Sequence, residues 1–194
     1  MRHNNIRDFE ATLLKEVCKD VKVEPVLLPI GNSENQSRNH AEKARLDVSA
    51  VGIWSSMERT FLDVHVMHPN SPSYIDKTPE QIYNQHEREK KRTYNDRVLQ
   101  VEKGSFTPLI FSTTGGMGPE CTKYHKRVAE LTSVKRGESY SDVMNYIRTR
   151  IRFSLLKCTL IAVRGERGQR RREDDTSISD LSLNLIPEHA TYEV

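Results

Sequence analysis

The chain has 194 residues with a formal net charge of +3; 36% of its residues are hydrophobic and 29% are charged. This length supports one domain with its own core, and the absence of an apolar run as long as a bilayer span argues against membrane insertion. Three widely spaced cysteines argue against a disulfide framework and lack zinc-knuckle spacing, and no apolar segment follows Met1 as in a secretory signal. We therefore expect an intracellular protein.

The first predicted element is a helix over residues 5–19. Glu10 lies beside its apolar stripe and Asp8 lies opposite, so Glu10 is the acid that we expect to point inward. Whether either acid joins a functional site stays open. The stripe recurs at helical spacing and indicates a face packed in the core: Ile6, Phe9, Leu13, Leu14 and Val17.

Strands are predicted next. Residues 21–28 are β-branched but are interrupted by Pro25 and followed by Pro29, which indicates an edge strand or an extended connection. Residues 31–42 are polar without apolar periodicity and predict a loop. Two strands follow over residues 44–53 and 59–67, and residues 54–58 join them as a hairpin.

The second strand of this hairpin alternates in character. Its even-numbered residues from Leu62 to Val66 are apolar and point to one face, so Asp63 and His65 project together from the other. Asp47 lies in the preceding strand, also between apolar residues. An acid on each of two neighbouring strands is thus a candidate functional pair.

Two aspartates in neighbouring strands need a physical explanation, because aspartate is depleted in strands. Carboxylate oxygens are ligands that hard cations such as Mg²⁺ prefer, so a shared metal ion is one explanation. The alternative is structural, with Asp47 and Asp63 in salt bridges. The expected partners in that case are Arg45, Arg59 or Lys91.

A helix is predicted to begin near Thr78, after a turn rich in proline and serine. Thr78 caps it, Pro79 takes its first position, and Gln81 completes a capping box. Basic and aromatic residues share a broad face of this helix. Its members are Tyr83, Glu87, Lys90, Lys91, Tyr94 and Val98.

Residues 98–102 and 106–113 are predicted as a pair of strands around a glycine-containing turn. The glycine run at 115–118 then precedes a helix over residues 120–135. The run lacks the Gly-Lys-Ser/Thr of a phosphate loop and the spacing of a dinucleotide fingerprint, so this pattern does not predict nucleotide binding.

A last helix is predicted over residues 140–157 and leads into an apolar run at 159–163. We expect one domain over residues 1–164 and a disordered tail over residues 165–194, which is polar and rich in charge and serine. Basic clusters near Arg92 and Arg152 could meet phosphates or form solvated helix faces, and charge alone does not decide.

The order of these features resembles the PD-(D/E)XK restriction-endonuclease-like core, an α/β fold with a mixed central sheet flanked by helices. More narrowly, it resembles the restriction-like endonuclease domain of non-LTR retrotransposons and related retroelement-derived proteins. The resemblance covers about residues 2–164. The matching segments are Arg2-His3-Asn4-Asn5-Ile6-Arg7-Asp8, Arg45-Leu46-Asp47, Asp63-Val64-His65-Val66 and Lys91-Arg92-Thr93-Tyr94.

The resemblance implies a hydrolase, a DNA endonuclease that uses Mg²⁺ or Mn²⁺. By analogy, Asp47 and Asp63 are the catalytic metal ligands and the main-chain carbonyl of Val64 is a third oxygen. His65 is also a catalytic candidate that could orient water or substrate, the alternative being a neutral histidine without a role. It stands where the strand of related enzymes carries lysine, so the catalytic lysine moves to the following helix. Two lysines qualify there: Lys91, with Lys90 as the alternative.

The implied partner is DNA, with no membrane and no small-molecule cofactor, and the implied location is nuclear. The Cys/His knuckle of the related proteins is missing, so the remainder of a retroelement polyprotein is a further expected partner. Leu46 also departs from the usual proline. The residues expected to bind DNA are Arg45, Arg88, Arg92, Tyr94 and Arg97.

Two alternatives to catalysis stay open. One is a degenerate nuclease fold that binds nucleic acid without cleaving it. The other is a non-enzymatic interaction module whose basic clusters are solvated faces.

Overall fold

The computed structural model describes residues 2–28 and 44–170 of the chain. The predicted loop at 31–42 lies outside these residues, as does the predicted tail beyond residue 170. The chain forms two compact units, and the first of them ends at Leu160. Of the second, the structure describes the last turns of a helix, from Ile161 to Arg170.

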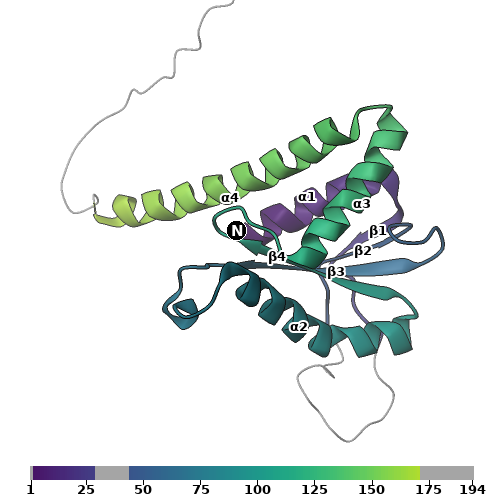
Figure 1. Cartoon of the computed structure of the whole chain (residues 1–194), viewed down its shortest axis with the longest axis horizontal. Coiled ribbons are helices and arrows are strands. Elements are labelled where there is room, and N and C mark those ends of the chain that lie inside the picture. The colour runs from purple at the N-terminus through teal and green to yellow at the C-terminus, as the bar shows by residue number, and fades with distance from the viewer. Residues whose placement is uncertain (1, 29–43, 171–194) are drawn as a thin grey trace, which may run out of the picture. The chain divides into compact units, whose positions relative to one another are not determined.

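The first unit is a mixed α/β unit built on a four-stranded sheet with the order β1-β2-β3-β4 (Figure 1). Strands β1 (Lys19–Val23), β2 (Val48–Val51) and β3 (Arg59–Met67) pair antiparallel, whereas β4 (Ser105–Ser112) runs parallel to β3. Parallel neighbours need a long crossover, which helix α2 (Pro79–Arg97) supplies. The expected α/β class with a mixed sheet is confirmed.

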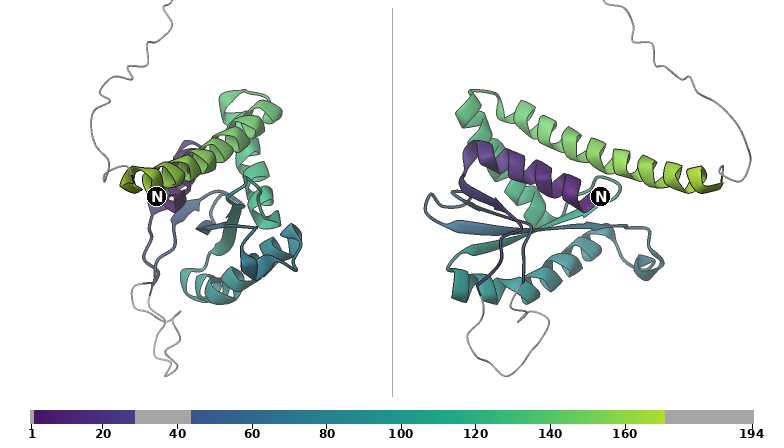
Figure 2. Two further views of the ribbon diagram at one scale, coloured as in Figure 1. Left: turned by 90° about the vertical axis from the view of Figure 1, so that its left-hand side faces the viewer. Right: turned by 180° about the vertical axis from the view of Figure 1, so that it is seen from behind.

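Helices cover both faces of the sheet. Helix α2 lies on one face, and α1 (Arg2–Val17) and α3 (Pro119–Arg136) lie on the other, as Figures 1 and 2 show. The first part of α4 (Tyr140–Arg170) packs its buried residues into the same cluster as α1 and α3. The main core therefore lies on the side of the sheet away from α2.

The alternation predicted for residues 59–67 is confirmed. Leu62 and Val64 are buried in the main core beneath α1 and α3. Phe61 and Met67 belong to smaller apolar clusters on the α2 side. Because successive side chains of a strand alternate, Asp63 also faces α2.

Other predicted features agree in kind. Strand β1 lies at the edge of the sheet, and α2 begins with the predicted capping box, in which Thr78 and Gln81 bond each other's backbone amides.

Helix α4 continues through Arg170, so residues 165–170 of the predicted disordered tail are helical. No helix in the described part of the chain is both long and apolar enough to cross a bilayer.

Two strand predictions are wrong in their bounds or type. Strand β2 begins at Val48, so Asp47 lies directly before it and not inside it. Residues 98–102 form a π-helical turn that extends α2, because Val98 packs into an apolar cluster with Phe106. Lys103, with φ of 54°, ends this turn.

Gly104 follows this turn and lets β4 start close to β3. A Cβ atom at Gly104 would collide with the carbonyl oxygen of Arg59, the first residue of β3. The glycine in this connection therefore permits a close approach of two backbones.

Candidate functional site

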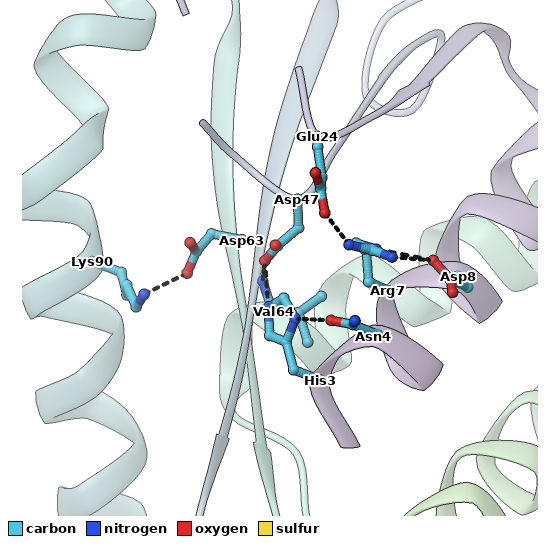
Figure 3. A network of polar contacts seen from close by, with 9 residues as sticks. All are labelled: His3, Asn4, Arg7, Asp8, Glu24, Asp47, Asp63, Val64 and Lys90. Carbon is cyan, nitrogen blue, oxygen red and sulfur yellow. Dashed lines mark hydrogen bonds and ion pairs between the residues drawn. The ribbon is translucent and has the colours of Figure 1, made fainter. Parts of the chain in front are cut away.

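Asp63 projects from the middle of β3 toward α2. Its side chain is 10% exposed, and Lys90 Nζ lies 2.8 Å from Asp63 Oδ2 (Figure 3). Lys90 comes from the face of α2 that packs on the sheet, and its stem also runs beside Tyr94, with Nζ 5.8 Å from the ring centroid. The result is a largely buried ion pair between a strand and its crossover helix.

Asp47 lies beside the same stretch of β3 but is held by different groups. Its Oδ2 accepts a hydrogen bond of 2.6 Å from the backbone N–H of Val64, the residue after Asp63. His3 Nε2, at the start of α1, lies 3.0 Å from the same oxygen. Both identified contacts fall on Oδ2 (Figure 3), so Oδ1 is the oxygen that these contacts leave for a ligand.

Charge and burial shift the pKa values of Asp63 and Lys90. Burial raises the pKa of Asp63, the Lys90 ammonium opposes that rise, and the Asp47 carboxylate adds to it. For Lys90, burial alone would lower the pKa, but attraction to Asp63 outweighs it and the pKa is raised. Lys90 therefore stays charged at neutral pH, and the two carboxylates are close enough to repel each other.

The backbone of Val64 also faces the Asp47 side. Leu62 uses its carbonyl to accept the Asp47 N–H at 3.0 Å, and Val64 donates its N–H to the Asp47 carboxylate. The N–H and C=O of one strand residue leave on the same side of the strand. The Val64 carbonyl therefore points to the side where Asp47 lies.

The two candidate lysines of α2 lie in different environments. Lys90 contacts Asp63, whereas Lys91 Nζ bonds Glu120 Oε1 at 2.7 Å, at the start of α3. Consecutive helix residues are rotated by about 100°, so one helix cannot present both to the same strand. Lys90, the alternative in the sequence analysis, is the lysine that lies with the aspartates.

His65 shares the α2-facing side of β3 with Asp63. Its ring lies against that of His86, with centroids 4.7 Å apart. Burial, together with the charges of His86 and Lys90, lowers the pKa of His65 to about 4. His65 is thus neutral at pH 7, and one of its ring nitrogens can accept a hydrogen bond.

The predicted DNA-binding residues do not form one surface. Arg88 and Arg92 are exposed on the side of α2 away from Lys90, and Arg45 is exposed but lies 3.6 Å from Glu24. Tyr94 is half-buried against Phe106.

Arg97 is a buried member of the same predicted set. Its guanidinium donates 2.7 Å to the carbonyl of Leu28, and a carbonyl contact to Leu27 is also present. This placement holds Arg97 inside the fold. We expected it on the surface, where it could bind DNA, and that prediction is wrong.

The three cations that were expected to pair with Asp47 and Asp63 pair with other acids. Arg45 pairs with Glu24, and Arg59 pairs with Asp20. Together with the Lys91–Glu120 pair, these contacts commit all three expected cations elsewhere.

The acids of α1 also lie away from Asp47. Asp8 pairs with Arg7 on the surface (Figure 3), and Glu10 is buried beside His125 of α3. The residue of α1 that reaches the site is His3. Sequence reasoning missed it as a site residue, because helical spacing alone does not reveal which strand a helix end contacts.

The donor set suits a hard divalent cation. Asp47 and Asp63 offer carboxylate oxygens, Val64 offers a carbonyl, and a cation would relieve the repulsion by which Asp47 raises the pKa of Asp63. Among residues 2–28 and 44–170, no group of three or more His, Cys, Asp or Glu side chains is arranged to hold a metal ion. Water would therefore have to complete the coordination, as is usual for Mg²⁺.

Comparison with known proteins does not assign the chain. No model of a known protein family matches the sequence. No curated protein matches it either.

Proposed function

We propose that the chain is a metal-dependent DNA endonuclease domain of the restriction-like, PD-(D/E)XK type found in retroelement-derived proteins. The observation that carries this proposal is the convergence of Lys90 on Asp63, beside an Asp47 carboxylate that is bonded to the next residue of β3. The order β1-β2-β3-α2-β4, with β4 parallel to β3, supports it because this order resembles that core. A nuclear location accompanies the proposal.

Phosphodiester hydrolysis needs shielding of the scissile phosphate and a nucleophile formed from water. A bound Mg²⁺ supplies Lewis acidity and lowers the pKa of water. Asp47, Asp63 and the Val64 carbonyl would hold the ion. His3 and the Val64 N–H hold the Asp47 carboxylate through Oδ2, and neither of these contacts uses Oδ1.

Lys90 supplies positive charge where negative charge develops. Its ammonium is held near Asp63 in a half-buried environment, where electrostatic interactions are stronger than in water. It can therefore stabilise the attacking oxygen or the phosphate oxygens of the transition state. A preorganised donor of this kind contributes on the order of 3 kcal/mol.

The test is nicking of supercoiled plasmid by the purified chain with Mg²⁺ or Mn²⁺. We expect Asp63→Asn and Asp47→Asn to reduce the nicking rate at least 100-fold, because each removes a negatively charged metal ligand. Asp76→Asn, a substitution at an exposed acid outside the site, is the matched control. Nicking that persists in EDTA, or that both site variants retain, would refute the proposal.

A second candidate function is nucleic-acid binding without cleavage. It is favoured by one specific observation, which is that Lys90 and His3 already occupy oxygens of Asp63 and Asp47. Salt-dependent DNA affinity that persists in EDTA, with no cleaved product in Mg²⁺ or Mn²⁺, would support this candidate over the nuclease. No DNA affinity at moderate salt would leave a non-enzymatic interaction module.

A further inference from the structure

A pocket of about 320 Å³ opens between the loop after β4, the start of α3 and α4. It lies on the α3 side of the sheet, whereas Asp63 faces α2, so it is separate from the site described above. Polar groups and glycines form much of its wall. They are Gly115, Gly116, Thr122, His125, Arg148 and Arg152.

The charge of this pocket is positive. Arg148 and Arg152 lie on successive turns of α4, and neither forms an ion pair with another described residue. None of the described residues that line the pocket is acidic. His125, which also lines the pocket, is committed to Glu10, with Nε2 2.9 Å from Oε1. The two guanidinium groups are therefore the charges that a ligand would meet.

The loop wall is held in place by hydrogen bonds to the end of β4. Gly116 donates its N–H to Ser112 Oγ at 2.8 Å, and Ser112 donates its N–H to the Gly116 carbonyl at 2.9 Å. Gly118 donates its N–H to the carbonyl oxygen of Ile110 at 2.9 Å. A wall fixed in this way needs little ordering when a ligand binds, which lowers the entropic cost of binding.

Arg152 is placed against this wall by the glycine beside it. Gly115 has φ of 89°, and a Cβ atom there would lie 3.0 Å from Arg152 Cγ. The stem of Arg152 thus packs along the bare backbone of Gly115. This contact holds the stem of a pocket-lining arginine next to the loop.

We propose that this pocket binds a phosphate group carried by a nucleotide or by a nucleic-acid backbone. Guanidinium groups match phosphate oxygens in geometry and bind them through paired, charge-assisted hydrogen bonds. The Thr122 hydroxyl adds a neutral donor. Met117 and Met144 supply apolar surface for the attached sugar or base, and the volume falls within the range of small-molecule pockets.

The proposal differs from a phosphate loop. The glycine run at 115–118 lacks the required motif, and the anion would be bound by arginines of α4 that follow it by some thirty residues in sequence. Gly115 leaves the wall without a side chain where Arg152 packs against it. Sequence spacing could not reveal this arrangement, because it depends on how α4 packs beside the loop.

The test compares two double variants of the full chain that remove equal charge from the same helix. Arg148→Gln with Arg152→Gln alters the pocket, and Arg150→Gln with Lys157→Gln alters exposed cations that do not line it. Binding is measured in EDTA with three probes: inorganic phosphate, deoxyadenosine monophosphate and a fluorescent 12-nucleotide DNA, single-stranded or duplex. Thermal melting checks that each variant folds.

We expect the pocket variant to lose about tenfold or more in affinity for a phosphate-bearing probe, while the control pair loses much less. A loss of affinity for the mononucleotide would identify the ligand as a free nucleotide. A loss of affinity for the oligonucleotide alone would identify it as a phosphate of a nucleic-acid backbone. Equal losses in both pairs would overturn the proposal in favour of a general attraction to α4. Wild-type protein that binds none of the probes would overturn it as well.

Discussion

At the scale of single residues, Lys90 and Lys91 show how one position along a helix changes a chemical role. Both are half-buried lysines on α2. One pairs with the strand acid Asp63, and the other pairs with Glu120 on the neighbouring helix. The difference arises from helix geometry, because consecutive residues of a helix point in directions about 100° apart.

Substitution of these two lysines separates catalysis from packing. We expect Lys90→Met to reduce plasmid nicking about 100-fold or more, because it removes the charge beside Asp63. Lys91→Met is the matched variant and should keep activity within a few-fold of the wild type. Rates at saturating Mg²⁺ measure both effects, and equal losses for the two variants would contradict the role assigned to Lys90.

His3 illustrates a limit of prediction at this scale. The alternation of β3 predicts that Asp63 and His65 share a face, and the structure agrees. His3 meets Asp47 across 44 positions of sequence, through the packing of α1 on the sheet. A contact of that kind has no local periodicity, so the sequence could not predict it.

At the scale of elements, Glu87 links α2 to the start of α3. Its Oε1 accepts a hydrogen bond of 2.9 Å from the backbone N–H of Glu120, in the first turn of α3. Such an acceptor satisfies an amide that has no partner within its own helix. Burial raises the pKa of Glu87, and the neighbouring Glu120 carboxylate adds to this rise.

The raised pKa predicts a pH-dependent effect of Glu87→Gln. An acid with a raised pKa in the folded state costs stability once it ionises, so the cost is absent at low pH and appears as pH rises through its ordinary value near 4.5. Glutamine keeps the acceptor oxygen without the charge. We therefore expect the variant to be more stable than wild type at pH 7.5 and no more stable at pH 4.

Urea unfolding at both pH values measures this difference. Glu89→Gln, at an exposed position of the same helix, is the control and should show no such gain. A Glu87→Gln variant that is less stable than wild type at pH 7.5 would show that the carboxylate charge stabilises the start of α3.

At the scale of the whole first unit, the buried pair of Glu10 and His125 joins helices far apart in sequence. Nε2 of His125 lies 2.9 Å from Oε1 of Glu10, and both side chains are almost completely buried. Glu10 belongs to α1 and His125 to α3, so the pair ties together the helices that cover the main core. Loss of one partner would leave a buried polar group unpaired.

A double-mutant cycle tests this tie. We expect Glu10→Ala and His125→Ala each to lower the free energy of unfolding by about 3 kcal/mol or more. In the double variant, the loss of free energy of unfolding should be smaller than the sum of the two single losses by about 1 kcal/mol or more. The reason is that the second substitution removes the partner that the first one left unpaired. Additive losses in urea unfolding would mean that the two residues do not interact.

Periodicity predicted most of the fold of this unit, and packing decided the rest. Helical spacing placed α1, and alternation placed β3. Residues 98–102 were misassigned as a strand because a short apolar run fits either state, and burial of Val98 beside Phe106 favours the helical turn. The order of strands in the sheet likewise depends on contacts that local patterns do not encode.

The contact between His3 and Asp47 has a practical consequence for handling the protein. Helix α1 begins one residue before His3, so a peptide fused ahead of it would start close to the residue that contacts Asp47. A polyhistidine affinity tag at that end would bring extra imidazoles near the proposed metal site. Metal titrations should therefore use protein tagged at the other end, or protein from which the tag has been cleaved.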